Sequence, residues 1–327
     1  MQTQSKKFGK TIEVKTFFKP GEYLDDIQMK ALYKDLVQIN QAKETPLQHK
    51  LILENRSIDE IKEIYASILV AIIFVQDEAV GFLLTPILAE SPQPIAHGGL
   101  TVIAKNCGIN LLGLLTLCNA NVLYERYSRI YVTNISSTPS IIEASAKFSR
   151  KVWPDPDADL IKPPRAYREV FDTLINKYVL KFFEDPETVV ADRKRFVIRS
   201  NSRKMGFNTN MRELSRSVKY KYLSFCFTWL DYELEEDLVQ VGVVDWLVGL
   251  RNKAMLFYLK YWFFPMKGRK LVRPSKTIPM PLEQTMSKSK KVESIKQASR
   301  VRGELPPSSH RTVRTGPYTA LHVNQAR

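Results

Sequence analysis

A short turn, Lys105–Asn110 (KNCGIN), holds residue types that let main-chain amides bind an anion. Gly108 can take a positive φ without steric cost, and Asn110 is a favoured N-cap for a helix that follows it. The free N–H groups of the turn and of the first helical turn point into one concavity, where the helix dipole favours negative charge. The turn therefore predicts an anion site.

The elements around this turn predict a βαβ unit. Residues 97–104 are rich in β-branched side chains and indicate a strand, whereas 111–124 contain good helix formers. A second apolar strand is predicted over 129–135. Two neighbouring parallel strands need such a crossover helix. The anion site is therefore expected between a central strand and the helix that leaves it.

The turn resembles the Q/R-x-x-G-x-G/A loop that holds the pyrophosphate of acyl-CoA in the GNAT superfamily of N-acyltransferases. Lys105 replaces the first Gln or Arg, and Asn110 replaces the final Gly or Ala. The resemblance covers roughly residues 11–148 and extends more weakly to about residue 230. It implies acyl transfer from acyl-CoA, or from acyl-carrier protein, to an amine. The cofactor-binding residues that it implies are Lys105, Cys107, Gly108, Ile109, Asn110, Leu111 and Asn134.

Amine transfer also needs a base with a pKa near the working pH. His97, on the predicted central strand, is the first candidate because histidine titrates in that range; a purely structural histidine is the alternative. Glu143 is the second candidate, provided that its helix faces the cleft. The family often carries a Tyr on that helix that protonates the leaving thiolate, and this chain has Phe148 at the matching place. That departure weakens the standard mechanism and favours a non-catalytic scaffold as the alternative function.

The N-terminal segments extend the resemblance. Residues 11–18 predict a strand, and apolar residues at helical spacing predict a helix over 22–40. Ser57-Ile58-Asp59-Glu60 fits a capping box that opens a second helix over about 57–67. Two β-branched apolar runs, joined by a turn at Asp77-Glu78, predict a hairpin over 68–88.

Later segments are expected to complete the sheet. Thr138 followed by Pro139 predicts a helix over 140–148, and residues 150–165, rich in Pro and Asp, predict an extended loop. An amphipathic helix is predicted over 167–183. Residues 195–199 and the aromatic run 218–230 predict strands, which either close the same sheet or form a separate C-terminal subdomain.

The segment 235–265 predicts an apolar amphipathic helix with a narrow polar face. Crossing a membrane would place Asp245, Arg251 and Lys253 in hydrocarbon, at roughly 2.5–3.5 kcal/mol each near the centre. Lying in the interface costs less free energy, since the aromatic residues are then immersed and the basic ones lie near headgroups. Burial against the rest of the chain or against a dimer partner is the alternative.

The C-terminal residues 266–327 contain seven Lys and seven Arg against three Glu, a net charge of +11, and one aromatic residue. Such a composition predicts a disordered basic tail. Attraction to an anionic membrane surface is one expectation for it. Nucleic-acid binding is disfavoured, because no base-reading motif accompanies the charge.

The three cysteines form no C-x-x-C pair, which is typical of a reduced cytoplasmic setting. The first ten residues lack the apolar core of a secretory signal. The expected localisation is therefore cytoplasmic, with peripheral contact at the inner membrane face. Cysteines and histidines show no ligand spacing, so no metal is expected.

Together these patterns predict an α/β (α+β) fold with a mixed central sheet flanked by helices, GNAT-like, with a helical C-terminal extension and a disordered basic tail. The expected division is an acyltransferase core over 1–155, a helical insertion and last strands over 156–234, the apolar helix over 235–265 and the tail over 266–327. The expected function is N-acyl transfer, with a long-chain acyl donor near a membrane as one form of it. The alternative is a GNAT-like scaffold that binds polyanions through its basic tail.

Overall fold

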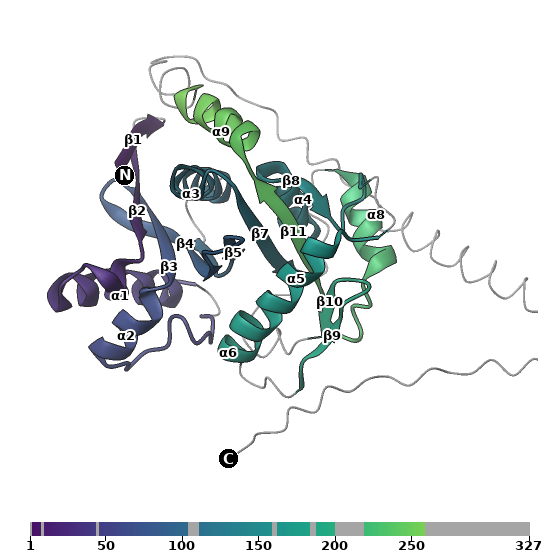
Figure 1. Cartoon of the computed structure of the whole chain (residues 1–327). Coiled ribbons are helices and arrows are strands. Elements are labelled where there is room, and N and C mark those ends of the chain that lie inside the picture. The colour runs from purple at the N-terminus through teal and green to yellow at the C-terminus, as the bar shows by residue number, and fades with distance from the viewer. Residues whose placement is uncertain are drawn as a thin grey trace, which may run out of the picture. The chain divides into compact units, whose positions relative to one another are not determined.

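The computed structural model describes residues 2–7, 10–43, 46–103, 111–158, 162–183, 188–199 and 219–258. Within them a mixed, mostly antiparallel sheet is flanked by helices, as the sequence predicts (Figure 1). The described strands are β1 (Gln2–Lys7), β2 (Lys10–Phe18), β3 (Ile68–Val75), β4 (Glu78–Ala89), β5 (Ile95–Gly98), β6 (Thr101–Ile103), β7 (Ile130–Ser136), β8 (Arg150–Trp153), β9 (Val190–Asp192), β10 (Val197–Arg199) and β11 (Glu236–Val244). Their order is β1-β2-β3-β4-β5-β7-β11-β10-β9, with β6 also paired to β4 and β8 to β11.

The N-terminal elements agree closely with their sequence signals. Helix α1 (Asp26–Gln41) follows a 3₁₀ turn, η1 (Pro20–Glu22), and is capped by Asp25. Helix α2 (Ile58–Tyr65) begins at the predicted capping box, in which the Glu60 amide donates to the Ser57 hydroxyl and the Ser57 amide to the Glu60 carboxylate. The hairpin of β3 and β4 is also confirmed.

The predicted βαβ unit is present. Strand β5 and strand β7 pair in parallel, and helix α3 (Leu111–Tyr127) connects them in the chain. The predicted strand over 97–104 is split, however, into β5 and β6, with Gly99 and Leu100 between them. The turn at 104–110, which leads into α3, lies outside the described residues.

The split gives the sheet a fork, which we define as the point beyond Gly98 and Asn134 where β5–β6 and β7 separate. The parallel register ends with Gly98 opposite Asn134. From there β6 stays with β4, whereas β7 stays with β11 as far as Ser136. The described strands therefore leave one edge of β6 and one edge of β7 facing the opening.

Two predictions in the C-terminal half are wrong. Residues predicted as a strand over 218–230 contain helix α8 (Tyr220–Trp229), which buries Tyr222 and Cys226 at four-residue spacing. Leu230, which follows the helix, is also buried. The first part of the predicted helix 235–265 is instead strand β11, every residue of which is buried between β7 and β10. The chain turns helical only at Trp246, where α9 (Trp246–Tyr258) begins.

The remaining helices are α4 (Pro139–Phe148), α5 (Arg165–Leu174), the π-helical turn η2 (Ile175–Val179) and α6 (Leu180–Phe182). One side of the sheet packs against α1, α2, α5 and α6 in the largest buried cluster. The other side packs against α3, α9, α4 and α8 through three smaller clusters. Residues 150–165, predicted as loop, contribute the short strand β8. Among the described residues, no helix has the length and apolar character needed to cross a bilayer.

Candidate functional site

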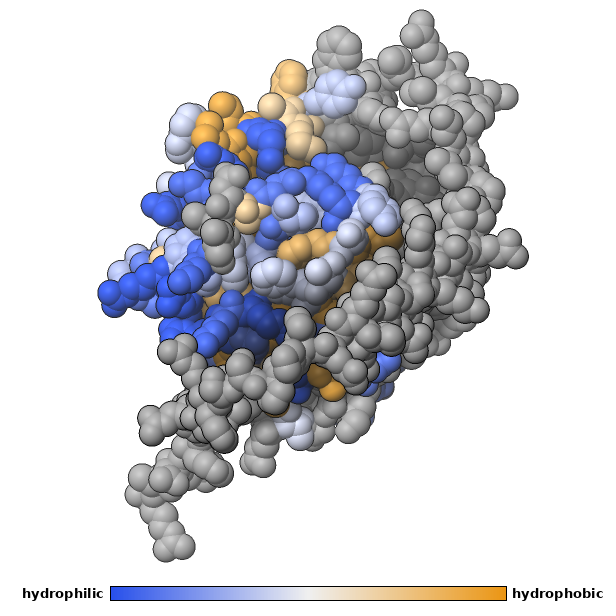
Figure 2. Space-filling view, turned by 90° about the vertical axis from the view of Figure 1, so that its right-hand side faces the viewer, coloured by the Kyte–Doolittle hydropathy of each residue, from blue (hydrophilic) through white to orange (hydrophobic). Residues whose placement is uncertain are grey.

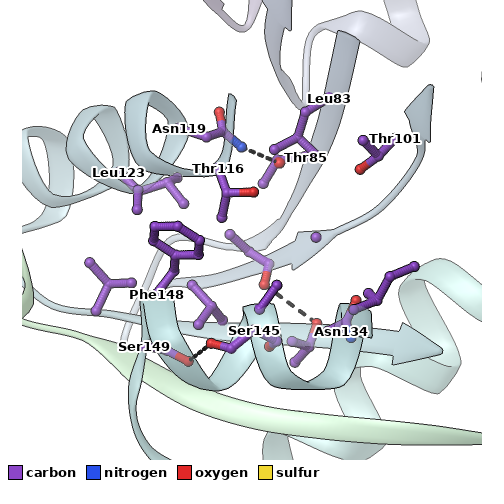
Figure 3. Close-up of a pocket in the computed structure, with 18 of the residues that line it drawn as sticks. Leu83, Thr85, Thr101, Thr116, Asn119, Leu123, Asn134, Ser145, Phe148 and Ser149 are labelled. Atoms are coloured by element: carbon purple, nitrogen blue, oxygen red, sulfur yellow. Dashed lines mark hydrogen bonds between the residues drawn. The ribbon is translucent and has the colours of Figure 1, made fainter. Parts of the chain in front are cut away.

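A pocket of about 120 Å³ lies at the fork, on the side of the sheet that carries α3 and α4. Gly98 and Asn134, the last parallel pair, both line it. The side chains of α3 and α4 form the two long walls, and Figure 3 shows the Phe148 ring pointing from α4 toward α3. The lining residues are Leu83, Thr85, Ala96, Gly98, Thr101, Leu112, Thr116, Asn119, Ala120, Leu123, Val132, Thr133, Asn134, Ile141, Ala144, Ser145, Phe148, Ser149 and Val244.

Two asparagine side chains give this mostly apolar pocket a polar feature. Asn119 donates from Nδ2 to the Thr85 hydroxyl, whereas its buried Oδ1 has no hydrogen-bond partner among the described residues. The Nδ2 of Asn134 is likewise buried without such a partner. Buried polar atoms are almost always paired, and leaving one unpaired costs about 1–3 kcal/mol. One free acceptor and one free donor in an apolar pocket match a ligand that carries amide groups.

The structure brings only part of the predicted cofactor site together. Asn134 lines the pocket. Leu111 is buried as the first residue of α3 and packs in the core beside the sheet. Lys105, Cys107, Gly108, Ile109 and Asn110 lie outside the described residues. The anion-binding turn therefore stays a prediction, although it connects two elements that border the pocket.

His97 does not have the titration expected of a base near neutral pH. Its ring is buried, 2% exposed, on the side of the sheet opposite the pocket. Burial lowers the pKa of His97 to about 3, with a smaller contribution from the nearby His49. The ring lies 2.9 Å from the Thr133 hydroxyl through Nδ1 and packs 4.1 Å from the ring of Tyr178. The neutral imidazole is thus held at the fork, and its lowered pKa makes it a weak base for the role that the sequence predicts.

Glu143 does not face the pocket, so the condition attached to this candidate is not met. The α4 residues that line the pocket are Ile141, Ala144, Ser145 and Phe148. Glu143 is buried on another side of the helix, where it accepts a hydrogen bond of 3.2 Å from the Lys219 amide at the start of α8. It also pairs with Lys147 at 3.0 Å. These contacts give it a packing role between α4 and α8.

Residues that the sequence analysis missed lie on the opposite side of the fork from the pocket. Tyr178 and His49 are both buried, and the Tyr178 hydroxyl lies 3.3 Å from His49 Nε2. They are 129 positions apart, so no local spacing connects them. A methyl group added to Gly99 would lie 3.5 Å from the Tyr178 hydroxyl. His49, Tyr178 and His97 thus form one buried cluster beside the fork.

Comparison of the chain with known protein families finds no matching family model, and comparison with characterised proteins finds no significant match.

Proposed function

We propose that this chain is an N-acyltransferase that takes its acyl group from acyl-CoA or acyl-carrier protein, as the GNAT-like turn suggests. The observation that carries the proposal is the fork with its pocket. A parallel strand pair opens at Gly98 and Asn134, and the helix between the two strands follows the predicted anion-binding turn. The pantetheine arm common to both donors is a narrow chain with amide groups. Free strand edges and the unpaired atoms of Asn119 and Asn134 are suited to such a chain.

The test is binding of CoA, measured by isothermal titration with the full chain and a matched pair of variants. Ala144 lines the pocket from α4. Ala144→Phe fills the space between the helices and is expected to weaken CoA binding by at least tenfold, about 1.4 kcal/mol or more. Ala144→Ser keeps the volume small and is expected to bind within about threefold of the unaltered chain. No binding of CoA by the unaltered chain would contradict the proposed donor.

Contact with an anionic membrane is the second part of the proposal, and α9 supports it. The helix packs on α3 through Val248, Gly249 and Asn252, which are buried. Its other side exposes the large apolar residues Trp246, Leu247, Leu250, Met255, Phe257 and Tyr258. Figure 2 shows hydrophobic residues near the upper end of the molecule, the level at which Figure 1 shows α9.

The charge of the chain selects an anionic lipid surface as the partner of this helix. Lys253 lies on α9 with its side chain half exposed, and residues 266–327 carry a net charge of +11. Each Lys or Arg near an anionic surface contributes about 1 kcal/mol. Val244 lines the pocket, and Trp246, two residues later, begins the exposed apolar side. A long acyl chain at the membrane would therefore lie close to the pocket.

Vesicle flotation tests the membrane contact with two matched double variants. Trp246→Ser with Phe257→Ser is expected to lower the fraction bound to phosphatidylglycerol-containing vesicles by about tenfold or more, since each side chain buries apolar area in the interface. Tyr23→Ser with Ile27→Ser is the control. These residues are 57% and 81% exposed, against 62% for Trp246 and 60% for Phe257, but lie on η1–α1. Equal loss in both double variants would contradict a specific role of α9.

The non-catalytic scaffold is a second candidate function, and one observation favours it. Burial lowers the pKa of His97 to about 3, which makes it a weak base, and neither His97 nor Glu143 lines the pocket. A scaffold that has lost its donor site should not bind CoA, so the same titration separates the two functions.

A further inference from the structure

The exposed apolar side of α9 has a basic residue at each of its borders. An α-helix turns through about 100° per residue, so Trp246, Leu250 and Phe257 lie on one stripe of α9. These side chains are at least 60% exposed. On the same helical wheel Lys253 lies at one border of the exposed apolar side and Arg251 at the other, and both are exposed. When the apolar side of such a helix is immersed in a bilayer, basic residues at its borders lie at the level of the headgroups.

Arg251 has a second arginine near it, which belongs to a different element. Arg150 begins β8 and pairs with Val243 near the end of β11. Its Nη1 lies 2.9 Å from Oδ2 of Asp245, the residue before α9. Burial lowers the pKa of the Arg251 guanidinium, repulsion from Arg150 lowers it further, and attraction to Asp245 raises it. The two guanidiniums and the carboxylate are therefore neighbours where β11 ends and α9 begins, a junction that Figure 1 shows beside β8.

The carboxylate of Asp245 does not neutralise the positive charge of this cluster. Its Oδ1 accepts hydrogen bonds from the amides of Leu247 and Val248, at 3.1 and 3.2 Å, and its Oδ2 contacts Arg150. Arg251 forms no ion pair among the described residues. Two guanidiniums against one carboxylate leave a net charge of 2 − 1 = +1. Because Asp245 already binds amides at the start of α9, an additional anion would bind to the arginines.

The backbone of β8 is irregular next to this cluster. Between two paired positions β8 has one residue more than β11, which makes a β-bulge. Lys151 lies in the bulge with a φ of 52°, an uncommon conformation for a residue with a side chain. The Tyr167 hydroxyl donates to its carbonyl at 2.6 Å and so holds the bulge in place. Bulges are frequent next to functional sites because they redirect side chains. The exposed Lys151 adds a further positive charge beside Arg150 in the chain.

We propose that Arg150 and Arg251 bind the phosphate of a membrane lipid whose headgroup is a phosphomonoester; this inference rests on the proposed function, in its membrane contact through α9. A guanidinium presents its N–H groups as a fork that matches two oxygens of a phosphate. A monoester has three oxygens outside the ester bond, so two forks bind it from different sides, whereas a diester has only two such oxygens. A monoester also carries the larger negative charge at pH 7, about −1.5 to −2.

Vesicle flotation with two anionic lipids tests this site. Phosphatidylcholine vesicles contain either phosphatidic acid, a phosphomonoester, or phosphatidylglycerol, a diester, in amounts that give both vesicles the same surface charge. The unaltered chain is expected to bind the phosphatidic acid vesicles at least about fivefold more tightly. Arg150→Lys with Arg251→Lys keeps both charges and removes both forks, so this variant is expected to bind the two kinds of vesicle within about twofold of each other.

Arg165→Lys with Arg168→Lys is the matched control. Both arginines are exposed on α5, which packs on the opposite side of the sheet from α9. This variant is expected to keep the fivefold preference for phosphatidic acid. A preference that is missing from the unaltered chain, or that persists in the Arg150→Lys, Arg251→Lys chain, would overturn the phosphate site and leave the membrane contact of α9 intact.

Glycerol 3-phosphate, the soluble form of the same headgroup, separates a lipid ligand from a free phosphate ester. Isothermal titration is expected to show binding at least about 100-fold weaker than binding to the vesicles, expressed per accessible phosphatidic acid, because the soluble ester lacks the apolar contacts of α9. Equally tight binding of glycerol 3-phosphate would overturn the lipid as the ligand. If the unaltered chain floats with neither kind of vesicle, the membrane contact in the proposed function is itself overturned.

Discussion

Lowering the pH from 6.5 to 4 is expected to destabilise the folded chain by about 3 kcal/mol for each of two buried histidines. Burial is the main cause that lowers the pKa of His49 to about 4 and of His97 to about 3. An unfolded chain binds protons at both residues below about pH 6.5, whereas the folded chain does not. Their stabilising contribution is therefore complete above pH 6.5 and is lost as the pH falls. Each pH unit corresponds to about 1.4 kcal/mol per histidine.

Urea unfolding at pH 7, 6.5, 5 and 4 measures this loss. The double variant His49→Gln with His97→Gln is the control, since it cannot take up these protons and should have a much flatter pH dependence. Carboxyl groups contribute equally to the pH dependence of the unaltered chain and of the double variant. Burial is the main cause that raises the pKa of Asp155, so protonation of this carboxyl at low pH favours the folded chain and opposes the effect of the histidines. Parallel curves for the two chains would show that the histidines are not buried in neutral form. A total loss of about 6 kcal/mol would rival the stability of an ordinary domain.

The burial that lowers the pKa values of these histidines also affects the proposed chemistry. A histidine whose pKa is lowered to about 3 is too weak a base to take a proton from an ammonium group, which is the role the sequence suggested for His97. A neutral histidine can still form hydrogen bonds, and His49 Nε2 lies 3.3 Å from the Tyr178 hydroxyl.

Local signals in the sequence predicted those elements whose information is local. The capping box at Ser57 and the turn at Asp77-Glu78 place α2 and the β3–β4 hairpin correctly. The helix over 111–124 and the strands on either side gave the parallel pair correctly, because a crossover of this length leaves few other topologies. The mixed sheet with flanking helices follows from these elements.

The two errors in the C-terminal half have one physical cause each. Strand β11 is buried on both sides, so its apolar residues show no two-residue period and resemble a buried helix. Val239 and Val241 face the cluster with α5, while Leu238 and Val244 pack on the other side. Helix α8 is rich in aromatic residues, which favour strands by propensity, but packing at helical spacing decides its structure.

The candidate site was predictable only where it is continuous in sequence. Asn134 was implied by the family resemblance and lies within a predicted strand, and it does line the pocket. The contact between His49 and Tyr178 joins residues 129 positions apart. It also depends on a π-helical turn that the amino-acid composition of this segment does not predict. The sequence also could not determine which face of α4 lines the pocket, because that depends on the packing of α8 against Glu143.

Loss of Arg195 is expected to destabilise the folded chain by about 3 kcal/mol, because the buried carboxylate of Glu236 would lose its main positively charged partner. Glu236, only 3% exposed, begins the central strand β11. Arg195 contacts both of its oxygens, at 3.1 Å from Nη1 and 3.0 Å from Nη2, and the Asp231 amide donates to it at 2.9 Å. Arg195→Met keeps the aliphatic stem and removes the charge. Arg199, whose Nε lies 3.5 Å from the carboxylate, limits the loss.

A double-mutant cycle separates this ion pair from general damage to the strand. Glu236→Gln together with Arg195→Met removes the carboxylate at position 236 along with its partner and retains an acceptor for the Asp231 amide. The double variant is therefore expected to be more stable than Arg195→Met alone by about 1–2 kcal/mol in urea unfolding, since an uncompensated buried charge costs more than the missing pair. Additive losses would show that the two side chains act independently. Because β11 pairs with β7 directly beside the fork, CoA binding by the folded fraction of Arg195→Met should also weaken if the register of these strands depends on this pair.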